Sequence, residues 1–286
     1  MTLVAALKIN KSSVIMAADC SVTVGDYNYE LARKVRYIEP MLIGRAGIQS
    51  EVNLMMHWLE HKIMPEDRLR DVFKKVRTTY NYLWKREFQR GVLEDYGIRL
   101  AELKNGNIDP KLREELLKKL KSGDSFSPSL LFCGHSDNEA RIYKINKFNR
   151  NISSIGRYES IGAGSTDFDK GIRGKLSSNL GDIAESSAIR MLAEGFSEAS
   201  HYNSVGRLTT FHRLDSKGYS ELSMETTSLL ANSYILHSRE LITDEGYKKI
   251  MDAASFDDEA AAHREFDQEV GKLSLTEILK KFPLSS

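Results

Sequence analysis

The second residue of this chain is a threonine, and its position could make it a nucleophile. Met1 precedes Thr2, and a small second residue allows an aminopeptidase to remove an initiator methionine. That cleavage would give Thr2 a free α-amine beside its hydroxyl. Because an α-amine titrates near about 8 in model peptides, it is partly unprotonated at neutral pH and can accept the hydroxyl proton. One residue would then supply both the nucleophile and the base of covalent hydrolysis.

Three further residues could complete such a site. Lys34 near Thr2 would lower the pKa of the reacting groups and help to move the proton, and Asp19 would keep Lys34 charged, because a buried ammonium without a partner is costly. The N–H of Gly47 could stabilise an oxyanion, an effect worth roughly 3–4 kcal/mol where one such donor has been removed. Taken singly, each residue type has an ordinary structural role, such as aspartate in turns. Their order behind an N-terminal threonine favours catalysis because their spacing also resembles that of the family described next.

Four segments that hold these residues resemble the start of proteasome β-subunits and their bacterial relatives. The segments are Thr2–Lys8, Val14–Asp19, Arg33–Val35 and Gly44–Gly47. The similarity is close over about the first 50 residues and continues loosely through Ile161–Gly164. It implies a threonine peptidase that hydrolyses peptide bonds through an acyl-enzyme on Thr2. It also implies a homo-oligomeric ring or spiral around the sites, and it allows an unfoldase partner.

The resemblance assigns a role to each residue of the site. The catalytic residues are Thr2, Asp19 and Lys34, the oxyanion residue is Gly47, and the supporting residues are Ser165 and Ser204. The sequence departs from the family pattern around this set. Ser21 stands where an arginine is common, Ala163 replaces a serine, and His201 replaces an acidic residue.

Arg45 is the candidate substrate-binding residue. It lies two positions before Gly47, so strand alternation places both on one side. The matching region of the family lines the pocket for the side chain that precedes the cleaved bond. A guanidinium there would favour an acidic substrate side chain through charge-assisted hydrogen bonds. The alternative is that Arg45 pairs with an acidic neighbour such as Glu51 and does not meet substrate.

The composition limits the function classes. With 41 basic and 40 acidic residues in 286, the chain has no charge excess typical of nucleic-acid or anionic-membrane binding. Cys20 and Cys133 are too few for a disulfide framework and show no metal spacing. No apolar run reaches the roughly 20 residues that span a bilayer, and no secretion signal is evident. We expect a cytoplasmic protein that needs no cofactor.

A competing motif predicts a metal site instead. The segment His57–His61 fits the His-x-x-Glu-His pattern of zinc peptidases, with Glu60 as its acidic residue. The apolar residues around this motif, from Val52 to Ile63, follow helical spacing and define the face of the helix opposite the two histidines. Both histidines should therefore face solvent, and no third ligand is evident.

The hydrophobic pattern predicts the elements that position these residues. The strands are expected at 2–8, 13–17, 34–38, 41–46, 130–133, 141–146, 158–162, 207–214 and 219–224, and the helices at about 49–64, 66–87, 110–121, 164 onwards, 182–196 and beyond 243. A further turn is expected at Gly25–Asp26. Strand runs that alternate with helix pairs favour segregated layers. We therefore expect an α+β protein, a four-layer α/β/β/α sandwich of the N-terminal nucleophile hydrolase fold.

The expected domain organisation is one domain over residues 1–235 and a helical C-terminal extension over 236–286. Charged residues and an Asn-Gly-Asn turn mark an insertion at about 91–125, which should hold one short helix. Two other functions stay open. The chain could be a non-catalytic, structural proteasome-like subunit, or an amidase or transpeptidase that passes the acyl group to an amine.

Overall fold

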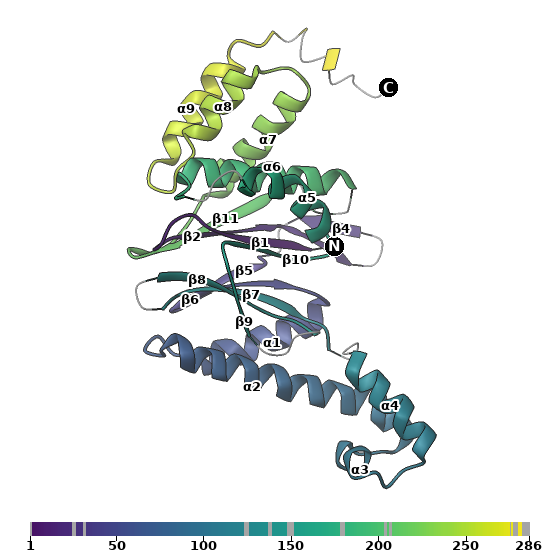
Figure 1. Cartoon of the computed structure of the whole chain (residues 1–286). Helices are drawn as coiled ribbons and strands as arrows, with labels where there is room; N and C mark the ends of the chain where they lie inside the picture. Colours follow the sequence, from purple (N-terminus) through teal and green to yellow (C-terminus); the bar gives the residue numbers. More distant parts are fainter. Residues whose placement is uncertain are drawn as a thin grey trace.

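The computed structural model describes most of the chain in two antiparallel sheets with helices on both sides (Figure 1). The described residues are 2–24, 27–30, 33–122, 126–136, 139–147, 152–177, 181–202, 205, 208–274, 276 and 280–281. The α+β class expected from the strand and helix pattern is confirmed. The turn expected at Gly25–Asp26 lies outside the described residues.

The first sheet has five strands in the order β10-β1-β2-β11-β12. The strands are β10 (Tyr158–Gly162), β1 (Leu3–Lys8), β2 (Val14–Asp19), β11 (Thr209–Asp215) and β12 (Gly218–Glu221). All described residues of β1 and β2 are buried or nearly so, which agrees with their unbroken apolar sequences. Thr2 therefore directly precedes one inner strand of this sheet, and Asp19 is the last residue of the neighbouring strand.

The second sheet has the order β5-β6-β7-β8-β9. The strands are β5 (Val35–Ile38), β6 (Met41–Ala46), β7 (Ser129–Ser136), β8 (Glu139–Ile145) and β9 (Ser153–Ile155), and a separate hairpin joins β3 (Ser21–Val24) to β4 (Tyr27–Glu30). The sequence pattern did not predict β3, β4 or β9. Each is only three or four residues long, too short for the alternation to be recognised.

The two sheets pack face to face through a shared apolar cluster. Val4, Met16 and Leu42 belong to it, and all three are fully buried. Gly44 on β6 allows a close approach of the two sheets, because a Cβ there would lie 2.5 Å from Cγ1 of Val4 and 2.8 Å from Sδ of Met16. The missing side chain thus sets the distance between the two sheets near the candidate site.

Helices cover the outer face of each sheet (Figure 1). On the second sheet lie α1 (Gln49–Lys62) and α2 (Leu69–Phe88), and on the first lie α5 (Ser165–Ser177) and α6 (Glu185–Tyr202). The buried stripe of α1, which includes Val52, Met56 and Leu59, joins a core with β6 and β7. The expected helix positions are confirmed here to within a few residues.

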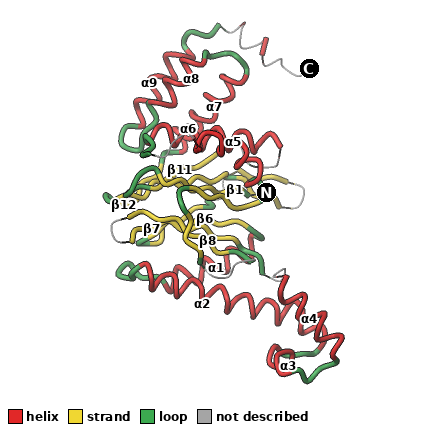
Figure 2. The backbone as a smooth tube through the Cα atoms, viewed as in Figure 1, coloured by secondary structure: helices red, strands yellow, loops and turns green. Residues whose placement is uncertain are grey.

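An arm projects beyond α2, at the lower right of Figure 2. It contains a π-helical turn (Gln89–Leu93), a 3-10 turn (Glu94–Tyr96), α3 (Leu100–Asn105) and α4 (Pro110–Ser122). The expectation of a single helix in this insertion is wrong, because α3 and the two turns precede α4. The arm has its own small core of Phe88, Leu93, Ile98, Leu103 and Leu116.

Three further helices lie over α6 at the C-terminal end (Figure 1). They are α7 (Met224–Ser238), α8 (Asp244–Asp252) and α9 (Glu259–Val270). The strand expected to reach Met224 is wrong: β12 ends at Glu221, and Ser223 caps α7 by accepting a hydrogen bond from the Thr226 N–H. The domain boundary predicted after residue 235 falls within α7. Within the described part of the chain, no helix combines the length and hydropathy needed to cross a bilayer.

Candidate active site

The start of β1 and the end of β2 meet at one edge of the first sheet. Val4 pairs with Ala18 in the antiparallel register, so Asp19 comes opposite Leu3. The Leu3 N–H donates to Oδ1 of Asp19 at 2.6 Å. Thr2, which is partly exposed, precedes Leu3 directly. A buried carboxylate therefore holds the first residue that follows the candidate nucleophile.

Lys34 connects this carboxylate to the second sheet. It lies one residue before β5, and its Nζ is 2.7 Å from Oδ2 of Asp19. The side chain of Asp19 is fully buried and that of Lys34 is 5% exposed. The pair is thus formed between the two sheets and away from bulk solvent, where a change in either partner has a large effect.

Ser21 also binds Asp19, and sequence reasoning missed this role. Its Oγ donates to Oδ2 of Asp19 at 3.0 Å, and the side chain is buried. From the sequence, Ser21 was recognised only as a departure from the family pattern. Its spacing could have revealed the contact, because residues two apart in extended chain lie on the same side. Asp19 therefore accepts hydrogen bonds from a backbone N–H, a hydroxyl and an ammonium group.

Burial changes the acid–base properties of Lys34. The loss of hydration lowers the pKa of its ammonium group below the usual value, and the neighbouring Arg45 charge acts in the same direction. The ion pair and hydrogen bond with Asp19 oppose this shift but do not cancel it. A lysine with a lowered pKa exchanges protons more readily near neutral pH than an exposed one.

Gly47 follows β6 in a conformation that other residues rarely adopt. Its φ is +131°, and a Cβ would lie 3.1 Å from Cα of Pro128. Glycine is therefore required by the backbone path after Ala46. Lys34 and Arg45 are hydrogen-bonded neighbours at this end of the second sheet, through the Arg45 N–H and the Lys34 carbonyl at 3.0 Å. Gly47, the candidate oxyanion residue, thus lies two positions after Arg45, whose backbone is hydrogen-bonded to that of Lys34.

Gly162 supports Thr2 from the other side. β10 pairs with β1 so that Gly162 is opposite Leu3, and its φ is +106°. A Cβ at Gly162 would lie 2.0 Å from the carbonyl oxygen of Thr2, which no rearrangement of side chains could relieve. The resemblance in Ile161–Gly164 therefore marks the place where the chain packs against the backbone of Thr2.

Of the two expected supporting serines, the structure describes Ser165 but not Ser204. Ser165 is the first residue of α5, three positions after Gly162, and is partly exposed. Ser204 lies outside the described residues, as does the side chain of His201. Ala163 is exposed. Their roles remain predictions.

The Arg45 side chain forms hydrogen bonds with other residues of the chain. Its side chain is mostly buried and donates to Oδ1 of Asn53 at 2.9 Å and to the carbonyl of Arg33 at 2.8 Å. Burial lowers the pKa of its guanidinium. No ion pair joins Arg45 to Glu51 in the described part of the chain, and Glu51 accepts from the backbone N–H of Ser127 at 2.8 Å. The substrate-binding role of Arg45 remains a prediction.

The histidine motif on α1 lies on the surface, as its helical position predicted. His57 and His61 are exposed, and Nδ1 of His61 contacts the carbonyl of His57 at 2.7 Å. Glu60 forms an ion pair with Arg36. Over the described ranges, no three His, Cys, Asp or Glu side chains are grouped so that they could hold a metal ion.

Comparisons with known proteins add no assignment. The chain matches no protein-family model, and no curated protein matches it.

Proposed function

We propose that this chain is a threonine peptidase of the proteasome β type, with Thr2 as the N-terminal nucleophile after Met1 is removed. The helices outside two face-to-face sheets support the four-layer α/β/β/α arrangement of N-terminal nucleophile hydrolases (Figure 1). The close resemblance over about the first 50 residues supports the same assignment.

The buried contact of Asp19 with both Lys34 and Leu3 carries the proposal. A structural ion pair would need only to join the two sheets. Here the same carboxylate binds Lys34 at 2.7 Å and the Leu3 N–H at 2.6 Å, next to the proposed nucleophile. Asp19 thus holds the backbone at Leu3 and also binds the Lys34 ammonium group, whose pKa is lowered.

The proposed reaction uses Thr2 as both nucleophile and base. The neutral α-amine takes the hydroxyl proton as Oγ1 attacks the peptide carbonyl, and the Gly47 N–H stabilises the oxyanion. The resulting ammonium group protonates the leaving amine, which gives an ester on Thr2. Water then attacks this ester with the amine as base, and the acid product leaves. Lys34 stabilises the reacting groups electrostatically, and Asp19 positions Lys34.

The resemblance supports an assembly and a location as part of the same proposal. We expect a homo-oligomeric ring or spiral in the cytoplasm that encloses the Thr2 sites, and an unfoldase partner could supply it with extended chains. Peptide and protein substrates would then reach the site only through the assembly.

Substitutions at Thr2 test the proposal. Intact mass first shows whether Met1 is absent from the purified chain. Thr2→Ser keeps a hydroxyl and an α-amine, so we expect turnover of a fluorogenic peptide panel within about tenfold of the wild type, whereas Thr2→Ala should show none. Circular dichroism checks that both variants fold.

The alternative functions give different results in the same assay. An amidase or transpeptidase would form amine adducts of the acyl group when an amine acceptor is added, which mass spectrometry of the products detects. A non-catalytic subunit would lack Thr2-dependent turnover in a correctly processed wild-type chain. Equal turnover by Thr2→Ala and the wild type would show that another residue is the nucleophile.

A further inference from the structure

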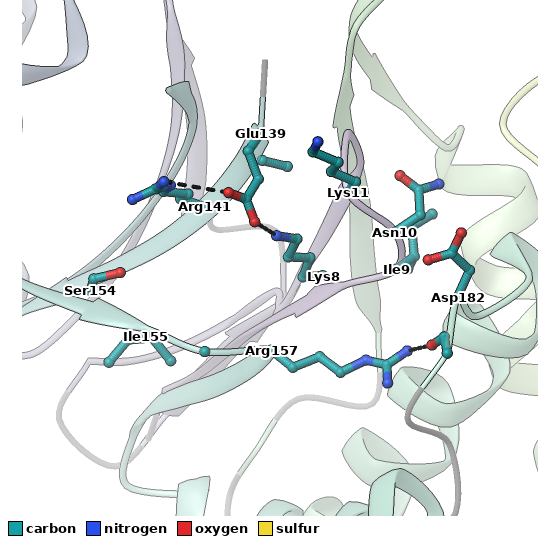
Figure 3. Close-up of a pocket in the computed structure, with 13 residues that line it drawn as sticks. Lys8, Ile9, Asn10, Lys11, Glu139, Arg141, Ser154, Ile155, Arg157 and Asp182 are labelled. Carbon is teal, nitrogen blue, oxygen red and sulfur yellow. Dashed lines mark hydrogen bonds and ion pairs between the residues drawn. The ribbon is translucent and has the colours of Figure 1, made fainter. Parts of the chain in front are cut away.

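A cavity of about 550 Å³ lies at the far end of β1 from Thr2 (Figure 3). Lys8, the last residue of β1, lines it, whereas Thr2 precedes the first residue of the same six-residue strand. Because a strand rises about 3.3 Å per residue, roughly 20 Å of backbone separates the two places. The cavity is therefore a different region from the proposed peptidase site.

Charged side chains from several parts of the chain line this cavity (Figure 3). The cationic residues are Lys8, Lys11, Arg141 and Arg157, and the acidic residues are Glu139 and Asp182. Four positive charges against two negative charges give the lining a formal charge of +2. They come from β1, the turn after it, β8, the segment before β10 and the segment before α6. Only the tertiary fold brings them together.

Glu139 is shared between two of the cations. Its Oε1 is 2.5 Å from Nζ of Lys8, and its Oε2 is 3.4 Å from Nη2 of Arg141. The hydrogen bond and charge of Lys8 are the main causes that lower the pKa of the Glu139 carboxyl, and Arg141 and Lys11 add to them. A single carboxylate thus lies in the field of three cations, and it cannot neutralise them all.

The other two cations, Arg157 and Lys11, make different contacts. Arg157 donates to the carbonyl of Gly181, a neutral acceptor. The Lys11 carbonyl accepts from the Ala140 N–H at 2.8 Å, whereas its ammonium group has no hydrogen-bond or ion-pair partner among the described residues, and the residue is exposed. An ordinary solvated surface would distribute such charges over an open face. Here they line one cavity of about 550 Å³, a volume within the range of small-molecule sites.

We propose that this cavity binds a small phosphate monoester. A phosphate group carries close to two negative charges at neutral pH and several acceptor oxygens, which matches the formal charge of the lining. Lysine and arginine donors from separate elements can surround such a compact anion with charge-assisted hydrogen bonds. Asp182, an acceptor at the edge of the cavity, would bind a hydroxyl of the ester's organic part. The volume holds a ligand of that size.

Titration calorimetry at constant ionic strength tests this proposal on the full chain. The probes are glycerol phosphate, inorganic phosphate, glutarate as a dianion without phosphorus, and glycerol as the neutral part alone. We expect saturable binding of glycerol phosphate, weaker binding of inorganic phosphate, at least tenfold weaker binding of glutarate and no heat from glycerol. Equal binding of glutarate and glycerol phosphate, or no saturable heat from any anion, would overturn the proposal.

Two charge changes and one matched control sharpen the test. Lys11→Gln removes a cation without breaking an ion pair and should weaken glycerol phosphate binding about tenfold, the loss of one charge-assisted contact. Glu139→Gln removes the competing carboxylate and should strengthen it. Lys85→Gln alters an exposed lysine on α2, outside the cavity, and should change nothing. Identical effects of Lys11→Gln and Lys85→Gln would show general attraction of anions and contradict a site.

Discussion

Two buried cations in this fold are held in opposite ways. Arg213 on β11 donates to Glu185 at 2.7 Å and Asp257 at 2.8 Å, and its Nε is 3.1 Å from Asp215. Hydrogen bonding to Asp257 is the main cause that raises the pKa of its guanidinium. Lys34 forms an ion pair with Asp19 at 2.7 Å, and burial lowers its pKa.

The difference is the one expected between a structural charge and the reactive charge that we propose for Lys34. Arg213 is surrounded by carboxylates from β11, α6 and the turn before α9, so it joins the C-terminal helices to the first sheet and stays protonated. At Lys34 the pKa-lowering effect of burial exceeds the opposing effect of Asp19, and Asp19 also binds the start of β1. Stability would favour the first arrangement, and proton transfer favours the second.

The largest effect should follow removal of the Lys34 charge. Lys34→Met keeps the length of the side chain but removes the ammonium group, and we expect peptide turnover to fall at least about 10²-fold. The matched variant Arg213→Met removes the other buried cation and should leave turnover per folded molecule within about twofold. Fluorogenic peptide assays on both, normalised by folded fraction, make the comparison. Similar losses in the two variants would remove the distinction.

Asp19→Asn should reduce both turnover and stability. The amide keeps an acceptor for the Leu3 N–H but leaves Lys34 without its counter-charge. We expect a loss of turnover of at least about tenfold and a fall in the free energy of unfolding of about 1–3 kcal/mol, the usual cost of an unsatisfied buried group. Urea unfolding and peptide assays measure the two effects. Wild-type turnover in a folded Asp19→Asn protein would mean that the charge of Asp19 has no role in the reaction.

Arg213→Met should act on stability instead. It leaves three carboxylates without their shared cation, and because the side chain of Asp257 is 61% exposed we expect a cost of about 1–3 kcal/mol, below that of a fully buried pair. Urea unfolding measures the change, and Arg190→Met serves as control because Arg190 makes a more exposed contact with Asp252 at 3.3 Å. An equal, small loss in both variants would show that the Arg213 cluster adds little to the fold.

His212, the neighbour of Arg213 on β11, provides a pH test. Burial lowers the pKa of this imidazole to about 4, against the opposing effect of Glu221, and Arg33 adds to the lowering. Its Nδ1 contacts the hydroxyl of Tyr219 at 3.1 Å. Between pH 6.5 and 4 the unfolded chain binds a proton at this residue that the folded chain does not. Stability should therefore fall with decreasing pH across that window, by at most about 3 kcal/mol from this group.

Urea unfolding at several pH values gives the slope, and His212→Gln should remove most of this contribution. The Arg213→Met variant should keep it, since Arg213 stays charged across the same window. If the His212→Gln and wild-type curves are parallel, the imidazole is not the source of the acid sensitivity.

Much of the fold follows from the sequence, because its central strands are uniformly apolar and its outer helices have one buried face. β1, β2 and the helices α1 and α2 were predicted for that reason. α7 was missed, because its buried positions include Thr226, Thr227 and Ser233 and so do not form an apolar stripe. Burial among other helices, which the sequence pattern does not encode, keeps these polar residues inside.

The pairing of Asp19 with Lys34 was predicted from the sequence, but the other contacts of the candidate site were not. The order of Thr2, Asp19, Lys34 and Gly47 along the chain indicated the chemistry. The sequence could not show that Asp19 binds the backbone of Leu3, because that contact depends on the register of β1 against β2. The cationic cavity was not predicted at all, since its residues are far apart in sequence.

The smallest effect concerns Arg45. Its guanidinium donates to Asn53 and to the carbonyl of Arg33, so a substrate must compete with these contacts. If it binds an acidic side chain before the cleaved bond, Arg45→Ala should lower the preference for Glu over Leu several-fold with little change for Leu substrates. A fluorogenic panel with both residues measures the ratio. An unchanged ratio would assign Arg45 a structural role alone.

Labelling of the N-terminal residue tests the central claim most directly. A peptide epoxyketone reacts with a nucleophile that carries both a hydroxyl and a free α-amine, so the adduct reports the two groups together. Peptide mass spectrometry of the treated wild-type chain should locate one adduct on a peptide that begins with Thr2, and Lys34→Met should acquire it at least about 10²-fold more slowly. A correctly folded chain that has lost Met1 yet acquires no adduct at Thr2, or acquires one elsewhere, would contradict the account.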